Sequence, residues 1–177
     1  KIREIDHIRH RIELGKDVYA GGDIDAELTD ELCDVLAEYV KIMDGYRVTA
    51  YKACASAAIR AAKNELFILD QIKRRTKLKV EVLSNSEHRF VSYESVAVRP
   101  EFHQMTAKSA AVVDVGGGSL QITIFKKGRA VTTQHLLLGT MRIYEKLSGI
   151  NEGLLHYEDL IKELVDKELE RFKAIYL

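Results

Sequence analysis

The chain has 177 residues, with 27 basic and 27 acidic side chains, so its formal net charge is zero. This length fits one domain or parts of two, and it suffices to bury a core. A neutral chain has no overall field that would attract nucleic acid or a membrane surface, and we expect neither as a partner. We also expect no membrane span and no secretion signal. Two cysteines, Cys33 and Cys54, are predicted to be buried free thiols, which indicates a cytoplasmic protein.

The first half of the sequence predicts mixed helices and strands. β-Branched residues among charges favour a strand over 2–14, followed by a turn over 15–25. An apolar stripe predicts a helix over 25–44, which Asp25 or Thr29 caps. We expect the remaining elements to be strands over 46–53 and 77–84 and helices over 55–64, 65–76 and 87–99. Ser86 is the expected cap of the last of these helices, and Pro100 helps to stop it.

The second half predicts an antiparallel meander over 110–135, with turns at "GGGS" and "KKGR". Helices are expected near 140–148 and over 157–176. The tract around residues 97–109 holds the only proline and is the candidate interdomain hinge. The fold class is therefore α/β, with an α/β half followed by a meander and helices.

The stretch "AAVVDVGGGSLQITIF" (110–125) places three glycines between two apolar strands. A turn without side chains lets an anion approach the backbone N–H groups, and the Ser119 hydroxyl adds a donor. Asp114, at the end of the incoming strand, has the carboxylate that a divalent cation prefers. This combination is typical of phosphate chemistry, although a plain hairpin beside an aspartate would show the same letters.

Four segments, in order along the chain, resemble the exopolyphosphatase / guanosine pentaphosphate phosphohydrolase (Ppx/GppA) family of the actin-like ATPase superfamily. "VVDVGGGSLQITIF" resembles the family's "DIGGGS(T)E", and "ACASAAIRAAKN" (53–64) resembles "ATSALRDAKN". "LKVEVLSNSEHRFVSYESV" (78–96) resembles "IEVISGxEEARLIYLGV", and "LLLGTMRIYEKL" (136–147) resembles "LPLGAVRLTE".

The resemblance implies an actin-like (ribonuclease H-like) fold in a partial two-domain arrangement. Residues 1–98 would belong to the first domain, 99–109 to the hinge, and 110–177 to the first half of the second domain. It implies Mg²⁺-dependent removal of the terminal phosphate from polyphosphate or a guanosine polyphosphate. The matching positions are Asp114 for the metal and Gly116, Gly117, Gly118, Ser119 and Arg60 for phosphate.

The catalytic positions depart from the family pattern. The family's pair of glutamates, of which the second is the general base, corresponds to Glu87 and His88. The metal-binding glutamate after the glycine turn corresponds to Gln121, whose neutral amide supplies no negative charge. A histidine can accept a proton near neutral pH, so His88 is a candidate base, but a histidine that has lost the role is the simpler interpretation.

The family's first phosphate-loop hairpin and a later "GASGT"-type loop are not found in the sequence. The chain is therefore expected to be part of a larger protein or a shortened relative. Three functions stay open: a phosphatase, a phosphate or nucleotide binder without turnover, and an assembly module. The last would use exposed strand edges, and a homodimer is one such assembly.

Overall fold

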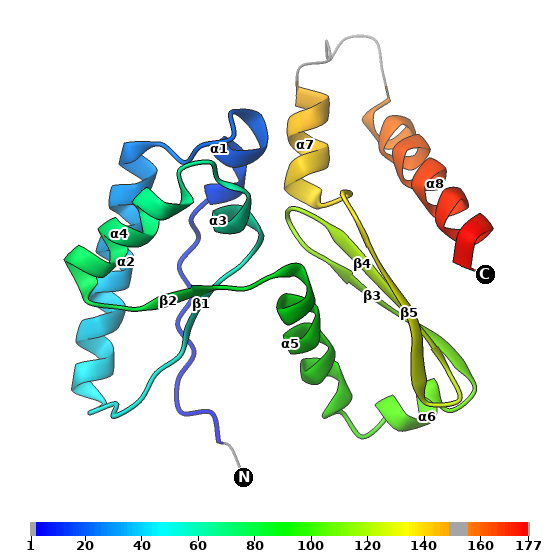
Figure 1. The fold of residues 1–177 in the computed structure, drawn as a ribbon, viewed down its shortest axis with the longest axis horizontal. Helices are drawn as coiled ribbons and strands as arrows, with labels where there is room; N and C mark the ends of the chain where they lie inside the picture. The colour runs from blue at the N-terminus through cyan, green and yellow to red at the C-terminus, as the bar shows by residue number, and fades with distance from the viewer. Residues whose placement is uncertain (1–2, 149–155, 177) are drawn as a thin grey trace.

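A computed structural model describes residues 3–148 and 156–176. The chain forms two halves that lie side by side, with helix α5 between them (Figure 1). The first half contains α1 (Leu14–Ala20), α2 (Ala26–Gly45), β1 (Ala53–Ala55), α3 (Ala57–Ala61), α4 (Glu65–Thr76) and β2 (Val80–Val82). The second contains α5 (Asn85–Ala97), α6 (Phe102–Thr106), β3 (Ser109–Val115), β4 (Leu120–Lys126), β5 (Arg129–Leu136), α7 (Thr140–Ser148) and α8 (Tyr157–Tyr176).

Helices α2 and α4 build the core of the first half, and both follow the sequence prediction closely. The Asp25 carboxylate accepts a hydrogen bond of 2.6 Å from the Leu28 N–H, which confirms Asp25 as the cap of α2. The apolar stripe of α2 packs against α4, which also contacts α3. The residues of this core with the least solvent exposure are Ile24, Cys33, Ile68 and Ile72.

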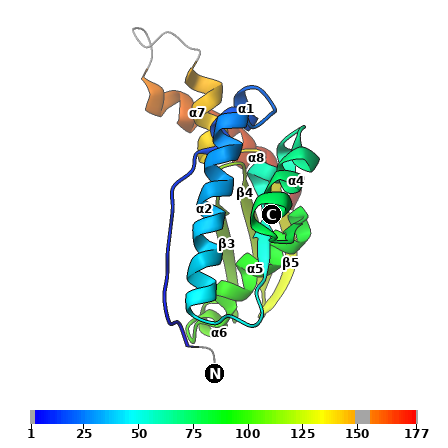
Figure 2. The same cartoon turned by 90° about the vertical axis from the view of Figure 1, so that its left-hand side faces the viewer.

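The strand predicted over 2–14 is wrong for the residues that the structure describes. Residues 3–13 carry no strand, and α1 occupies most of the predicted turn. The segment runs alongside α2 (Figure 2), and the side chains of Ile5 and Ile8 are 81% and 48% exposed. A strand needs a neighbouring strand to satisfy its backbone groups, and none pairs with this segment among the described residues.

In the described part of the first half, the one sheet is the small parallel pair of β1 with β2. Its register pairs Ala53 with Val80 and Ala55 with Val82. The strand predicted over 46–53 is therefore wrong except at Ala53, and the one predicted over 77–84 shortens to 80–82. The helix predicted over 55–64 shortens to the single turn and a half of α3. Cys33 is buried as expected, but Cys54 is exposed, because it lies on an edge strand that has no second neighbour in the described structure.

Helix α5 begins two residues before the predicted start. Ser84, not Ser86, is its cap: the Ser84 hydroxyl accepts from the Glu87 N–H, and the Glu87 carboxylate accepts from the Ser84 N–H. This reciprocal capping box satisfies two backbone donors and so fixes the start of the helix. The predicted hinge tract contains α6, and its division of the chain into domains stays a prediction.

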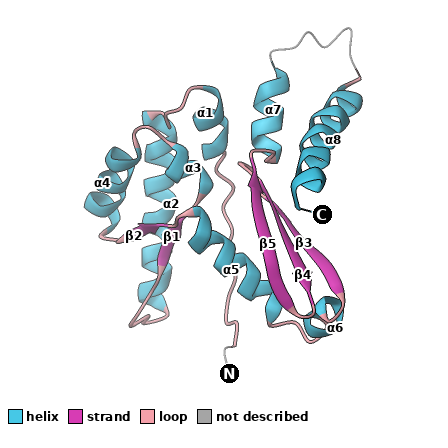
Figure 3. Cartoon of the chain, turned by 45° about the vertical axis from the view of Figure 1, so that its right-hand side comes forward, coloured by secondary structure: helices cyan, strands magenta, loops and turns pink. Residues whose placement is uncertain are grey.

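The predicted meander is confirmed as the antiparallel sheet β3-β4-β5 (Figure 3). One face packs against α5 and α6 through a cluster of stacked and edge-on rings, Tyr93, Phe102 and Phe125. The other face packs against α8 through Ile122, Ile124 and Phe172. Helices α7 and α8 begin and end as the sequence predicts. Within the described ranges, no helix has the length and apolarity that a bilayer crossing requires.

Candidate phosphate site at the glycine turn

The turn after β3 is anchored through its carbonyl groups. The Gly116 N–H donates to the Ser119 carbonyl at 2.9 Å and closes the hairpin. The Gly116 carbonyl accepts from the Thr140 N–H, and the Gly117 carbonyl accepts from the N–H groups of Met141 and Arg142, all at 2.9–3.1 Å. These are N–H groups of the first turn of α7, which have no partner within their own helix. The turn therefore anchors the start of α7.

The three glycines of the turn are not equivalent. None has a positive φ, so none is needed for its backbone conformation. A Cβ on Gly118 would lie 2.1 Å from the Tyr19 hydroxyl oxygen, so packing requires glycine there. A Cβ on Gly116 would meet nothing closer than 3.5 Å, and one on Gly117 would be 3.2 Å from the Met141 Cγ. Packing thus requires glycine at position 118, makes a side chain at position 117 press on Met141, and would tolerate a Cβ at position 116.

The N–H side of the turn has no protein partner in the described structure. The N–H groups of Gly117, Gly118 and Ser119 make no hydrogen bond to another described residue, and neither does the Ser119 hydroxyl. Gly117 is exposed, whereas Ser119 is buried to 8% exposure. Consecutive N–H groups that lack partners form a concave donor set that suits an oxyanion.

The side chain of Arg142 on α7 contacts this turn. Its Nε donates to the Gly118 carbonyl at 3.0 Å, and its Cζ lies 4.6 Å from the centre of the Tyr19 ring. A guanidinium stacked on an aromatic face is held in one orientation. The terminal nitrogens of Arg142 make no hydrogen bond to the described part of the chain, so they can bind an anion. Arg60 is used differently, since its guanidinium donates to the Leu83 carbonyl just before α5.

Next to the turn, three polar side chains lie on the α5 face of the sheet. The register places Asp114 opposite Gln121, and Gln121 opposite His135. The Gln121 amide nitrogen is 3.5 Å from the Nδ1 of His88 on α5. Asp114, Gln121 and Arg89 also line a small cavity of about 170 Å³ between α5 and strands β3 and β4. The structure therefore brings together three predicted site residues, Asp114, Gln121 and His88.

The electrostatic environment of this face is positive. Desolvation lowers the pKa of His135, and the nearby charges of Arg60, Arg142, Arg89 and His88 lower it further. Burial raises the pKa of Tyr19, while Arg142 and Arg60 oppose that rise. Each arginine disfavours a proton on a neighbouring imidazole and favours a bound anion for the same Coulombic reason. Cations from α3, α5 and α7 thus converge on the polar face.

The predicted catalytic residue Glu87 has a structural contact here. Its carboxylate closes the capping box of α5, and hydrogen bonds from the Ser84 side chain and backbone lower its pKa. Side chains of adjacent residues on a helix diverge by about 100°, so Glu87 and His88 point in different directions. A catalytic role of Glu87 stays a prediction.

Among the described residues there is no group of three or more histidine, cysteine, aspartate or glutamate side chains that is placed to hold a metal ion. Asp114 is the one carboxylate lining the small cavity. Mg²⁺ is commonly bound by one or two carboxylates together with water and the phosphates of the substrate. The donor set fits a magnesium ion that arrives with its phosphates, and it does not form a cage of its own.

Arg142, His135 and Arg89 were not identified as site residues from the sequence. Arg142 lies within the "LLLGTMRIYEKL" segment, and its position in that segment was the available signal. His135 could not be placed from the predicted meander alone: regular pairing outward from the 126–129 turn would put Gln134 opposite Gln121, and the β-bulge at Ile124/Phe125 shifts the register so that His135 lies there instead. For Arg89, which sits one residue after His88 on α5, the sequence offers no comparable signal.

The chain is similar to known proteins along its whole length. A sequence model of the Ppx/GppA phosphatase family matches residues 1–177, the whole chain. The chain belongs to the Ppx/GppA phosphatase family. The crystal structure of the Aquifex aeolicus member of this family is 28% identical in sequence and superposes with a TM-score of 0.66. The match includes 91% of this chain and 51% of the Aquifex aeolicus chain. The actin-like ATPase fold expected from the sequence is confirmed.

Two further relatives agree with that assignment. An exopolyphosphatase from Cytophaga hutchinsonii shares the fold, with 22% identity and a TM-score of 0.75 over 93% of this chain and 53% of its own. A bifunctional 3-dehydroquinate synthase/phosphatase from Fusobacterium nucleatum is 26% identical over 93% of this chain and 26% of its own length. The chain therefore spans about half of the solved Ppx/GppA structures and a quarter of that bifunctional relative.

Proposed function

We propose that this chain forms the anion-binding part of a phosphatase that removes the terminal phosphate of polyphosphate or a guanosine polyphosphate. The observation that supports this most is the set of three N–H groups, of Gly117, Gly118 and Ser119, that lack a partner in the described structure. They lie at the exposed Gly117 and beside Arg142. Membership of a phosphatase family supplies the class of reaction.

In the proposed reaction these residues act on the terminal phosphate group. The three N–H groups and the Ser119 hydroxyl bind its oxygens, and the free nitrogens of Arg142 neutralise the charge that grows as water attacks the phosphorus. The bridging P–O bond breaks, which releases orthophosphate and the shortened chain. Asp114 would hold Mg²⁺, which when bound neutralises phosphate charge. Because Tyr19 stacks on Arg142, it positions that guanidinium.

A second candidate function, phosphate binding without turnover, is favoured by the contact between Gln121 and His88. When the Gln121 amide donates to Nδ1 of a neutral His88, the proton of that imidazole resides on Nε2. His88 then offers a hydrogen-bond donor and has no free lone pair to take a proton from water. In this alternative the same cradle binds a phosphate and does not cleave it.

Release and binding must be followed together in the full-length protein. We expect the natural protein to release orthophosphate from long-chain polyphosphate or pppGpp in the presence of Mg²⁺. Asp114→Ala should abolish this release, while substrate binding persists. Gly117→Val should abolish binding, because its side chain starts 3.2 Å from the Met141 Cγ and so displaces the turn that carries the free N–H groups, whereas the control Gly45→Ala, which meets nothing within 4 Å, should bind normally. Binding without release establishes the second candidate. The absence of both refutes the phosphate site.

His88 is tested separately. His88→Ala should leave binding intact, and release should fall about 10²–10⁴-fold only where His88 is the base. His88→Glu restores the family's carboxylate at this position. If His88→Glu raises the rate of release above that of the natural protein, the natural site is a weakened phosphatase, and if His88→Ala releases phosphate at the full rate, His88 is not the base.

A further inference from the structure

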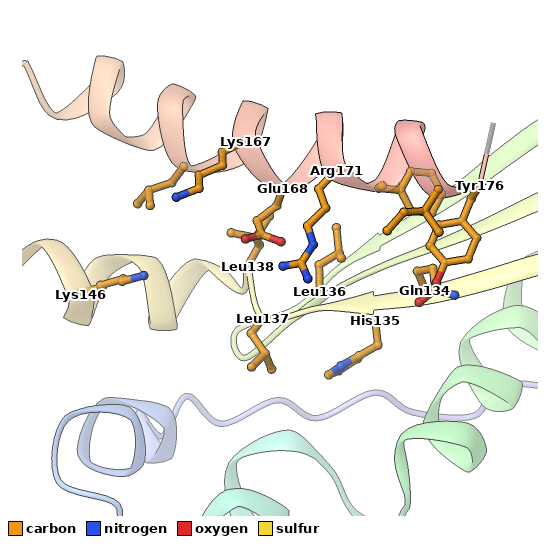
Figure 4. Close-up of a pocket in the computed structure, with 13 residues that line it drawn as sticks. Gln134, His135, Leu136, Leu137, Leu138, Lys146, Lys167, Glu168, Arg171 and Tyr176 are labelled. Atoms are coloured by element: carbon orange, nitrogen blue, oxygen red, sulfur yellow. The ribbon is translucent and has the colours of Figure 1, made fainter.

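A second cavity, of about 540 Å³, lies on the opposite side of the sheet, between β5, α7 and α8 (Figure 4). Gln134 and Leu136 of β5 and Leu138 just after it form its floor. His135 and Leu137 also line it, but residues alternate between the two faces of a strand, and their side chains point away from α8 (Figure 4). The cavity is thus separated from the glycine turn by one layer of sheet.

The flank of α8 that lines the cavity carries both charged and apolar side chains. Residues 164, 167, 168, 171 and 175 recur with helical spacing and all line it. Lys167, Arg171 and Ile175 are exposed, whereas the buried Phe172 packs against the sheet. The charges of Lys167, Glu168 and Arg171 therefore lie at the open side of the cavity, between α8 and β5 (Figure 4).

Basic side chains reach this cavity from two helices. Lys146 comes from α7, while Lys167 and Arg171 come from α8. In the described structure none of the three is within 4.0 Å of a carboxylate, although other lysines of α8 are paired, Lys162 with Asp166 and Lys173 with Glu170. With Glu168 as the one acidic group, the lining carries a formal excess of two positive charges.

Apolar surface surrounds these charges. Leu138 and Phe172 are buried at 8% and 4% exposure, and Ile175 and Tyr176 form the rim at the end of α8. The lining is thus polar and apolar in about equal parts, and such a combination of convergent charged groups and apolar walls suits a small organic anion. The basic groups require an anion, and the apolar walls suit a planar ring.

We propose that this cavity binds a small phosphorylated molecule that carries a ring, a nucleotide being the class that fits. Lys146, Lys167 and Arg171 bind its phosphate, and the ring packs against Leu138, Ile175 and Tyr176. This site is additional to the phosphate site at the glycine turn, and it occupies the opposite face of β5. The proposal does not depend on the proposed function.

The test is calorimetric titration of the full-length protein with adenosine 5′-monophosphate, ribose 5-phosphate and inorganic phosphate as probes. We expect saturable binding of the nucleotide at millimolar or lower concentration and weaker binding of the other two. Lys146→Gln and Arg171→Gln should each weaken nucleotide binding about tenfold or more, because each removes a charge-assisted contact. The matched control on the same helix is Lys173→Gln, which should bind as the natural protein does.

Two further variants separate the alternatives. Ile175→Ser should weaken binding of the nucleotide but not of ribose 5-phosphate. Arg142→Ala weakens any binding at the glycine turn, and the nucleotide binding that Lys146→Gln and Arg171→Gln weaken should persist in this variant. The proposal is overturned if the nucleotide does not bind, if Lys146→Gln and Arg171→Gln have no effect, if Lys173→Gln weakens binding equally, or if Arg142→Ala abolishes it. Circular dichroism of each variant excludes unfolding as the cause, and Lys146→Gln alters only an exposed side chain.

Discussion

The two faces of the sheet β3-β4-β5 are built from the same three strands, yet they have different tasks. The α8 face of β4 presents Ile122 and Ile124, which are 5% and 6% exposed and pack against Phe172. The α5 face presents Asp114, Gln121 and His135 near the glycine turn. Alternation along a strand allows both faces to exist at once. The middle strand therefore presents aliphatic side chains to α8 and polar side chains to the glycine-turn end of the α5 face.

The α5 face is itself divided along the strands. At the end far from the glycine turn, Phe125 is 1% exposed and stacks with Tyr93 and Phe102, so this end resembles a core. At the near end, polar and charged groups replace the rings. Helix α5 crosses both ends, and its Tyr93 packs in one while its His88 contacts the other. The packing of the far end therefore holds α5 in place over the polar end.

The largest effect is expected from breaking the apolar face. Phe172→Ala should lower the free energy of unfolding by about 3–5 kcal/mol, since it leaves a cavity beneath α8. Thr123→Ala on the α5 face, which removes only the 3.1 Å contact with Thr133, should cost about 1 kcal/mol or less. Urea denaturation of both variants measures the difference. Equal losses would show that the two faces contribute alike and would contradict the comparison.

The next largest effect is expected from crowding the glycine turn between β3 and β4. A Cβ on Gly139 would lie 2.2 Å from the Gly118 carbonyl carbon and the Ser119 nitrogen, both backbone atoms that cannot rotate away. Gly139→Ala should therefore lower the free energy of unfolding by about 1–3 kcal/mol and also weaken phosphate binding. Denaturation and phosphate titration test this. Unchanged binding in a folded Gly139→Ala variant would separate the turn from the binding site.

A smaller effect is expected from loosening the helix that covers the polar end. Ser84→Ala removes the cap of α5 and should cost about 1 kcal/mol. The matched control is Ser86→Ala, whose hydroxyl bonds only the exposed Arg89 guanidinium at 3.1 Å and should cost little. Thermal unfolding distinguishes them. A larger loss for Ser86→Ala would restore Ser86 as the cap.

The smallest effect is the titration of His135. Burial and nearby arginines hold its pKa below the ordinary 6.5, so the unfolded chain binds a proton first as the pH falls. The stability from neutral His135 is complete above pH 6.5 and is lost as the pH falls from there toward the lower folded pKa. NMR titration of the imidazole measures that pKa, and pyrophosphate should raise it if the anion binds nearby. His135→Gln should flatten this part of the stability profile.

Local patterns determined much of the secondary structure. Helices α2 and α4 carry strong apolar stripes and clear end signals, and α7, α8 and the meander also appear where the sequence predicts them. The errors fall where a neighbour in space decides the outcome. The segment 3–13 has strand-like letters but no strand beside it in the described structure. The error at the start of α5 is different: the spacing Ser84-x-x-Glu87 is that of a capping box and was available in the sequence, and it was missed in favour of Ser86.

By itself the sequence determined the family, the α/β class, the glycine turn and the acid that precedes it, because these depend on contiguous residues. Only the tertiary structure decided which backbone groups of that turn are hydrogen-bonded and which are left without a partner in the described structure. Its carbonyls anchor α7 and its third glycine accommodates Tyr19, while its N–H groups stay open beside Arg142. Tyr19 and Gly118 are far apart in the chain, and so are His88 and Gln121; packing alone brings such groups together, so no local pattern encodes them.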